Sequence, residues 1–415
     1  MAFKEPRSIW KDIRKGILFV VVLSAFMALF EYYGAFANID GKMQDRFWLR
    51  HGRSASSNDM IVLEIDDGAY AQLFKSVSPM SPTILTDLVR QIASVQPTVV
   101  GIDVLTTSEA DGGDTYRRFA EEKLGAKVIW ISGEVGFDPH SADFFKWISG
   151  KDDELVVKPT EVLGYGLEDL KRRPEILWGP AVNPTEQDLR LRRFFRELKV
   201  SENVGSLESA TPKESWARMV AQQYCKENPG KCNKHLEGAA VYLKADGRRP
   251  FSAGLLEFFT RSGEHAVFKQ SGRELLKQLA KGKIALVGGT FAHSGDVHET
   301  SDGSMAGIFL NARAIAAEVD GVEGAREIQE PYGFLLDVGF GVLVVLVFAV
   351  LGWFQLEPRA ARTMMIGSAI VAVATMVILY FSGYMFSVVA VVIAAIIQQA
   401  YDFWTKNPKI VEESE

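Results

Sequence analysis

The chain has 415 residues, a net charge of −6, and a composition that is 47% hydrophobic and 24% charged. This length exceeds what one compact domain usually needs. Charged residues are concentrated in the middle of the chain and long apolar runs occupy both ends, which is typical of a membrane protein with a soluble insert. The middle section is itself mildly acidic, and this argues against a nucleic-acid-binding protein.

The first predicted element is a membrane helix over residues 17–37. Basic residues are frequent before it, and positive charge stays on the cytoplasmic side, so residues 1–16 are predicted to form a cytoplasmic tail. A cleaved signal peptide is the alternative, because residues 17–30 have the length of a signal-peptide core and Ala35-Phe36-Ala37 resembles a cleavage site. The sequence leaves open whether this helix is retained or cleaved.

Residues 38–331 are predicted to form an α/β domain with a mostly parallel sheet. Nearly unbroken apolar runs, as in strands that are covered on both faces, predict strands over 60–65, 98–104, 127–131 and 283–287. Apolar residues at helical spacing separate these runs, and strand–helix–strand alternation implies right-handed crossovers between parallel strands. The predicted helices are 82–95, 115–124, 215–224, 252–261, 273–279 and 307–319, with a further strand at 240–243.

The section 138–210 is less regular than the rest of this domain. Proline, glycine and charged residues are frequent in it, so fewer elements are predicted there. Residues 189–198 fit either a strand or a helix, and residues 201–212 are predicted to form a loop.

The two cysteines of the chain, Cys225 and Cys232, flank a Pro-Gly turn. Such a turn brings two sulfur atoms close together, and a disulfide then forms in an oxidising compartment. The alternative is two unrelated surface thiols. Two cysteines do not complete a tetrahedral zinc site.

Three apolar runs close the chain, at residues 332–354, 363–382 and 385–404, and each is long enough to cross a bilayer as a helix. Arginines lie between the first two runs and lysines lie in the tail, residues 405–415, which places both on the cytoplasmic side. The predicted topology is therefore a multi-pass protein of a bacterial inner membrane, with both termini in the cytoplasm and the large domain in the periplasm.

Acidic residues follow the predicted strands at their carboxyl ends. Asp66 and Asp67 end the first strand, Asp103 lies near the end of the second, and Asp296 follows the last one. Ligands of open α/β sheets favour this edge, and a cleft lined by Asp66, Asp103 and Asp296 would suit a cation, an amine or a hydroxyl-rich ligand. Asp residues at these positions also make turns and cap helices, so a purely structural role is the alternative.

Arg192 and Arg193 form a pair that could recognise an anion, although such pairs also occur on solvated faces and in salt bridges. The chain has no dinucleotide fingerprint, no P-loop and no nucleophile elbow. His293, Asp296 and His298 are close in sequence but lack a standard metal spacing. We therefore expect no catalytic residues, no bound metal and no cofactor.

Short motifs occur along the domain in a distinctive order. They are Gln44-Asp45-Arg46, residues 61–67, residues 99–104, residues 179–183, Leu191-Arg192-Arg193, residues 282–290, Asp296 and residues 307–312. In this order, over about residues 40–325 and with membrane helices on both sides, they resemble the CHASE type-2 domain. That family is an extracytoplasmic sensory domain, typically found on the N-terminal side of cyclase and kinase domains. The resemblance implies a sensory role for residues 38–331.

The expected function is that of a membrane-anchored sensor. It would bind an extracytoplasmic ligand or an envelope protein and would signal through its membrane helices to a separate output protein, because no kinase or cyclase domain fits in residues 405–415. The alternative is a structural or assembly subunit of a cell-envelope complex. The expected partners include the lipid bilayer and no nucleic acid, and a homo-oligomer remains open.

Overall fold

The computed structural model describes the central domain in most of its length. The described residues are 18, 22, 25, 58–107, 113–135, 156–181, 190–191, 193–201, 210–233, 240–242, 250–300, 303–321, 326–327 and 384–385. The predicted membrane segments lie outside these residues, apart from isolated positions in the first and the start of the last. Within the described part of the chain, no helix combines the length and the apolar character that a membrane span requires.

The chain divides into two compact units. Residues 49–141 and 153–324 form one unit, and residues 1–48, 142–152 and 325–415 form the other. In the second of these, a short parallel pair joins β18 (Arg326–Glu327) to β19 (Tyr384–Met385). All other elements described below belong to the first unit.

A six-stranded sheet forms the centre of this unit, and all of its strand pairs are parallel. Its strand order is β12-β1-β15-β2-β3-β6, so neighbouring strands are often distant in sequence. The α/β class with a mostly parallel sheet, which the alternation of apolar runs predicted, is confirmed. The strands are β1 (Met60–Ile65), β2 (Val99–Asp103), β3 (Lys127–Ser132), β6 (Leu177–Pro180), β12 (Ser252–Gly254) and β15 (Ile284–Gly289).

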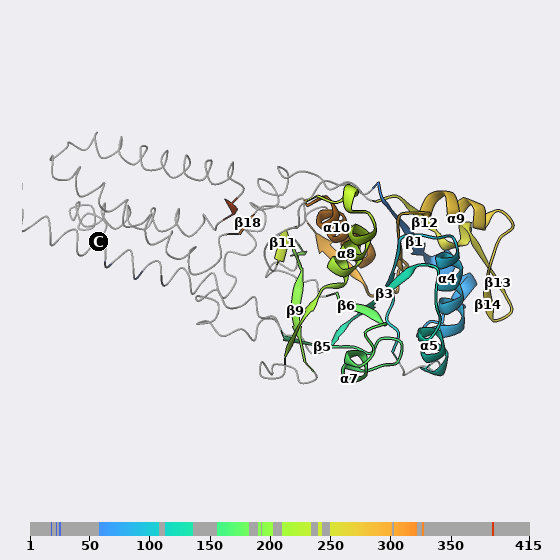
Figure 1. Ribbon diagram of the computed structural model, residues 1–415, viewed down its shortest axis with the longest axis horizontal. Coiled ribbons are helices and arrows are strands. Elements are labelled where there is room, and N and C mark those ends of the chain that lie inside the picture. The colour runs from blue at the N-terminus through green and yellow to red at the C-terminus, as the bar shows by residue number, and fades with distance from the viewer. Residues whose placement is uncertain are drawn as a thin grey trace, which may run out of the picture. The chain divides into compact units, whose positions relative to one another are not determined.

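Helices cover both faces of the central sheet (Figure 1). Because side chains alternate along a strand, Ile61 and Leu63 of β1 join one apolar cluster, whereas Met60 and Val62 join the other. The first face packs against α3 (Asp67–Phe74), α4 (Pro82–Ser94), α5 (Gly113–Ala120) and α9 (Gly272–Ala280). The second face packs against α8 (Trp216–Glu227) and α10 (Gly307–Asp320).

The packing of α8 depends on glycines in two strands. The fully buried indole of Trp216 lies on Gly101, where a Cβ atom would come within 2.8 Å of the ring, and its Nε1 donates to the Ile129 carbonyl at 3.0 Å. At Gly179 a Cβ would come within 2.6 Å of the Trp216 backbone nitrogen. These glycines let the first turn of α8 approach the sheet closely.

Smaller sheets and short helices surround this core. One sheet of order β10-β9-β5-β4 consists of β4 (Glu134–Val135), β5 (Val156–Pro159), β9 (Glu197–Val200) and β10 (Thr211–Glu214). A three-stranded sheet of order β17-β16-β7 contains β7 (Arg190–Leu191), β16 (Val297–Thr300) and β17 (Gly303–Ala306). The remaining elements are the pair β8 (Arg193–Phe195) and β11 (Ala240–Tyr242), the hairpin β13 (Phe259–Ser262) and β14 (His265–Phe268), α7 (Leu167–Lys171), η3 (Pro229–Lys231) and η4 (Leu255–Glu257).

The predicted elements agree with the structure in most places. The four apolar runs are strands of the central sheet, and five of the six predicted helices are helices, with bounds shifted by a few residues. Residues 189–198, which fitted a strand or a helix, contain strands, and the strand at 240–243 pairs with β8 outside the central sheet.

The helix predicted over 252–261 is wrong. Residues 252–254 form β12, which pairs in parallel with β1, and residues 259–262 form one arm of the β13–β14 hairpin. Gly263 has a φ of +62° and turns the chain between these arms. Pairing with strands elsewhere therefore outweighs the helical spacing of the local sequence.

Candidate functional site

Polar residues gather where the strands of the central sheet end, and Asp66 is the first of them. It is the N-cap of α3, and its Oδ1 accepts a hydrogen bond from the Ala69 backbone nitrogen at 2.7 Å. A capping carboxylate of this kind satisfies an amide that the helix itself leaves unpaired. The Asp66 side chain also lies over Gly254 of β12, where a Cβ would come within 3.0 Å of Oδ2.

Asp67 connects α3 to the loop that follows β15. Its Oδ1 accepts a hydrogen bond from the Ala292 backbone nitrogen at 3.0 Å. The same loop is held by an aromatic stack between Tyr70 and Phe291, with ring centroids 4.1 Å apart. Both contacts fix the loop against the start of α3.

Asp103 ends β2 and faces α10. Its Oδ2 accepts a hydrogen bond from Nδ2 of Asn311 at 3.0 Å, and Asn311 itself is buried, with 4% of its surface exposed. Asn311 is the fifth residue of α10, and the residues around it in the helix are apolar and buried. The amide is therefore a polar contact inside an otherwise apolar interface between helix and sheet.

Asp296 approaches the start of α10 from the loop before β16. Its backbone carbonyl accepts a hydrogen bond from the Gly307 nitrogen at 2.9 Å, and its carboxylate occupies the space that a side chain at Gly307 would need. Oδ1 of Asp296 is 2.9 Å from Nε2 of His298. Only glycine at position 307 leaves room for this carboxylate at the first turn of the helix.

Asp103, Asn311, Asp296 and His298 form one electrostatic cluster. The pKa of Asp103 is raised from 3.8 to about 7, first because burial strips water from the carboxyl group and second because of the negative charge of Asp296. The hydrogen bond from Asn311 and the charge of His298 act in the opposite direction. Asp103 therefore exchanges its proton near neutral pH.

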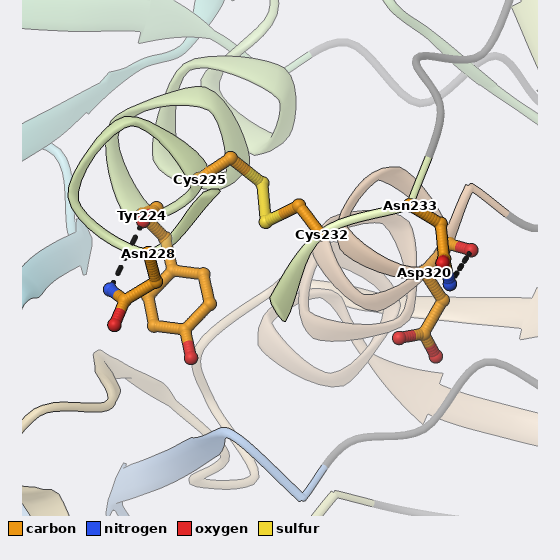
Figure 2. The surroundings of a disulfide bond; sticks show 6 residues. All are labelled: Tyr224, Cys225, Asn228, Cys232, Asn233 and Asp320. Carbon is orange, nitrogen blue, oxygen red and sulfur yellow. Dashed lines mark hydrogen bonds between the residues drawn. A yellow bond between two sulfur atoms is a disulfide. The ribbon is translucent and has the colours of Figure 1, made fainter. Parts of the chain in front are cut away.

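The far end of α10 is tied to a disulfide-bonded segment (Figure 2). Cys225, near the end of α8, is bonded to Cys232, with 5.6 Å between the Cα atoms. The next residue, Asn233, donates its backbone N–H to the Val319 carbonyl at 3.1 Å and its side-chain Nδ2 to the Asp320 carbonyl at 2.8 Å. These bonds satisfy carbonyl groups at the C-terminal end of α10.

Comparison with known protein families decides the identity of the domain. The CHASE2 domain matches residues 17–354, which is most of the chain. The chain belongs to the CHASE2 domain family. The comparisons with curated proteins and with solved structures gave no match.

The resemblance to the CHASE type-2 domain is thereby confirmed, and with it the assignment to a family of extracytoplasmic sensory domains. The strand-end motifs that carry the resemblance lie together in the CHASE2 fold. Residues 61–67, 99–104 and 282–290 are neighbouring parallel strands and their carboxyl ends, and residues 307–312 begin α10.

The predicted cleft of Asp66, Asp103 and Asp296 is only partly assembled in the CHASE2 domain. Asp103 and Asp296 act on each other, whereas the described contacts of Asp66 are with α3 and Gly254. Strand β15 lies between β1 and β2, and this separates the two strand ends. A ligand role for Asp66, Asp67, Asp103 and Asp296 stays a prediction.

The predicted anion-binding pair is described only in part. Arg192 lies outside the described residues, and Arg193 is described by its backbone, which pairs with Tyr242 in the β8–β11 ladder. The preceding strand β7 pairs in parallel with β16, which joins Leu191 to Thr300. The role of the two arginines stays a prediction.

Two polar contacts of α10 escaped the sequence analysis. One is the hydrogen bond from Asn311 to Asp103, which the sequence signals only by an amide residue within an apolar helix. The other is a buried ion pair between Arg196 and Glu318. Nε of Arg196 lies 2.5 Å from Oε1 of Glu318, and Nη2 of Arg196 lies 3.2 Å from Oε2. Glu318 is 8% exposed and Arg196 is 3% exposed. A charged residue on the buried face of α10 was the available signal.

Among the described residues, no group of three or more His, Cys, Asp or Glu side chains is arranged to hold a metal ion. His293 is exposed, and His298 contacts the carboxylate of Asp296.

Proposed function

We propose that this CHASE2 protein is a multi-pass sensor of the bacterial inner membrane, with its α/β domain in the periplasm and a separate protein as its output partner. In this proposal one helix before the domain and three helices after it anchor the chain in the bilayer. The domain binds its ligand without chemical turnover, and the signal leaves through the membrane helices.

The disulfide is the observation that carries the proposed location. Disulfides persist in oxidising compartments such as the periplasm and are rare in the cytosol. The bond between Cys225 and Cys232 closes a short loop at the end of α8, and Asn233 then anchors this loop to α10. A periplasmic site for the domain supports membrane spans on both sides, as the apolar runs predict.

The position of α10 supports a signalling role. This helix contacts the polar cluster at its first turn and the disulfide segment at its end, and residues 321–331 lead from it to the predicted span at 332–354. A change in the packing of α10 would therefore reach the chain at the point where the predicted membrane helices begin.

Thiol labelling of the full-length protein in bacterial cells tests the proposed location. Cells are lysed in acid to preserve thiol states, and the denatured protein is treated with maleimide–polyethylene glycol before and after reduction. We expect no labelling before reduction and two labels after it, because both cysteines are bonded in an oxidising compartment. Two labels without reduction, in cells that oxidise a periplasmic control protein, would place the domain in the cytosol.

Carbonate extraction and cross-linking test the anchoring and the partner. The protein should stay in the membrane pellet at alkaline pH, and release into the supernatant would refute the anchoring. A photo-reactive amino acid introduced in the predicted cytoplasmic tail, residues 405–415, should give a cross-linked species of defined mass. If every cross-link joins two copies of this chain, the separate output partner is refuted and a homo-oligomer takes its place.

A further inference from the structure

Helix α10 is held differently at its two ends. At its far end the buried pair of Arg196 and Glu318 and the hydrogen bonds of Asn233 fix it to neighbouring elements. At its first turns Asn311 donates to the carboxyl group of Asp103, and the carboxylate of Asp296 packs against Gly307, whose nitrogen donates to the Asp296 backbone carbonyl. The interactions at this end can therefore change with charge.

The carboxyl groups of Asp103 and Asp296 are close enough for the charge of one to oppose ionisation of the other. Asn311 of α10 donates to Asp103, and His298 of β16 contacts Asp296. Among the described residues, Asp296 and His298 are the charged or titratable groups that act on Asp103, and Asn311 is its neutral partner. When both carboxyl groups are ionised, they repel each other beside the first turns of α10.

We propose that Asp103, Asp296, His298 and Asn311 form a proton-responsive contact through which the acidity outside the cytoplasm controls how tightly the first turns of α10 pack on the sheet. The ligand of this contact is the proton. Both forms of Asp103 accept the amide of Asn311, but a neutral Asp103 does not repel Asp296, whereas an ionised Asp103 does. Acid therefore tightens this end of α10, and alkali loosens it.

The inference rests on the proposed sensory function for its biological role only. The response lies within the described domain, and its measurement needs neither a membrane topology nor an output partner. If the topology experiments fail while α10 responds to pH, the proposed function falls and this inference stands. If α10 does not respond to pH while the topology holds, this inference falls and the proposed function stands.

Hydrogen–deuterium exchange of the full-length protein, purified in detergent, tests the proposal. Exchange of peptides covering residues 303–313 is measured between pH 5 and pH 8.5, and each rate is divided by the intrinsic chemical rate at that pH. If Asp103 regains its ordinary acidity when the helix end opens, protection should fall about tenfold between pH 6 and pH 8. Peptides from α4, which lies on the opposite face of the sheet, serve as the internal reference.

Three variants assign the response to this cluster. Asp103→Asn keeps an acceptor for Asn311 and cannot ionise, so the protection of residues 303–313 should change less than about twofold over the same range. Asp296→Asn removes the opposing charge and should move the midpoint to lower pH. His298→Gln keeps a donor for Asp296 but removes the positive charge, and should move the midpoint to higher pH.

Asp114→Asn is the matched control, since it makes the same chemical change at an exposed position in α5. It should keep the wild-type profile. A wild-type protection that does not vary with pH overturns the proposal, and so does an Asp103→Asn variant that keeps the wild-type profile. If Asp103→Asn does not fold, the opposite midpoint shifts of Asp296→Asn and His298→Gln decide the question, and shifts in the same direction refute the proposal.

Discussion

The raised pKa of Asp103 makes the stability of the domain depend on pH in a direction opposite to that of ordinary acidic residues. In the folded protein the carboxyl group holds its proton up to about pH 7, whereas in the unfolded chain it loses the proton near pH 4. Between these values the folded state binds more protons than the unfolded state. Stability therefore falls as the pH rises from about 4 to about 7, and the contribution is constant above that range.

The size of the effect follows from the two pKa values. A shift from 3.8 to about 7 makes ionisation of Asp103 in the folded state cost about 4 kcal/mol in total, at about 1.4 kcal/mol per unit. Part of this cost is already present at pH 5, where the unfolded chain is mostly ionised. The loss between pH 5 and pH 8 is therefore about 2–3 kcal/mol.

Asp103→Asn isolates this contribution, because asparagine has almost the same shape and cannot ionise. The free energy of unfolding is measured by urea denaturation of the full-length protein at several pH values, with intrinsic tryptophan fluorescence, to which the buried Trp216 contributes, as one signal. Between pH 5 and pH 8 the wild type should lose about 2–3 kcal/mol more than the variant. Parallel pH profiles for the two proteins would refute the assignment of the raised pKa, and Asp114→Asn controls for the loss of an exposed carboxylate.

Three further substitutions test the packing around α8 and α10. Replacing Cys225 and Cys232 by serine should lower the free energy of unfolding by about 2–3 kcal/mol, because an open loop has more freedom in the unfolded chain. Wild-type protein in reductant should show the same loss in urea denaturation. No loss would contradict the prediction. Gly101→Ala should lower the free energy of unfolding by about 1–3 kcal/mol, since the methyl group of the alanine meets the Trp216 ring. An unchanged melting temperature would mean that α8 can move away freely. Glu318→Gln should lower the free energy of unfolding by about 3 kcal/mol, measured by calorimetry or urea denaturation, because it takes the negative charge away from the buried Arg196. A variant as stable as the wild type would show that this pair does not hold α10.

The sequence predicted four of the six strands of the central sheet, because these four are covered on both faces. Such strands are nearly continuous apolar runs, and the run at 60–65 matches β1 at both ends. Residues 252–261 show where this reasoning stops. Leu255, Phe258 and Phe259 are all buried, at positions that also suit a helix, but β12 is defined by its distant partner β1 and β13 by its hairpin partner β14.

The candidate site was predictable as an edge of the sheet and not as a set of contacts. Parallel strands bring their carboxyl ends to one edge, so acids after several strands were expected there. Which of them meet depends on strand order, and β15 lies between the strands that carry Asp66 and Asp103. The hydrogen bond from Asn311 to Asp103 spans 208 residues, and no local pattern contains it.

The contacts of α10 combine a fixed end with an adjustable one, which fits the proposed sensory function. A buried ion pair such as Arg196 and Glu318 adds little net stability, but it penalises every position of the helix in which either charge is unpaired. It therefore holds the far end of α10 in one register. The cluster at the first turns changes its charge near neutral pH, so the same helix can alter its packing at one end without losing its place at the other. A charge change at the sheet edge therefore acts on the start of α10, while the ion pair keeps the helix end before residues 321–331 in place.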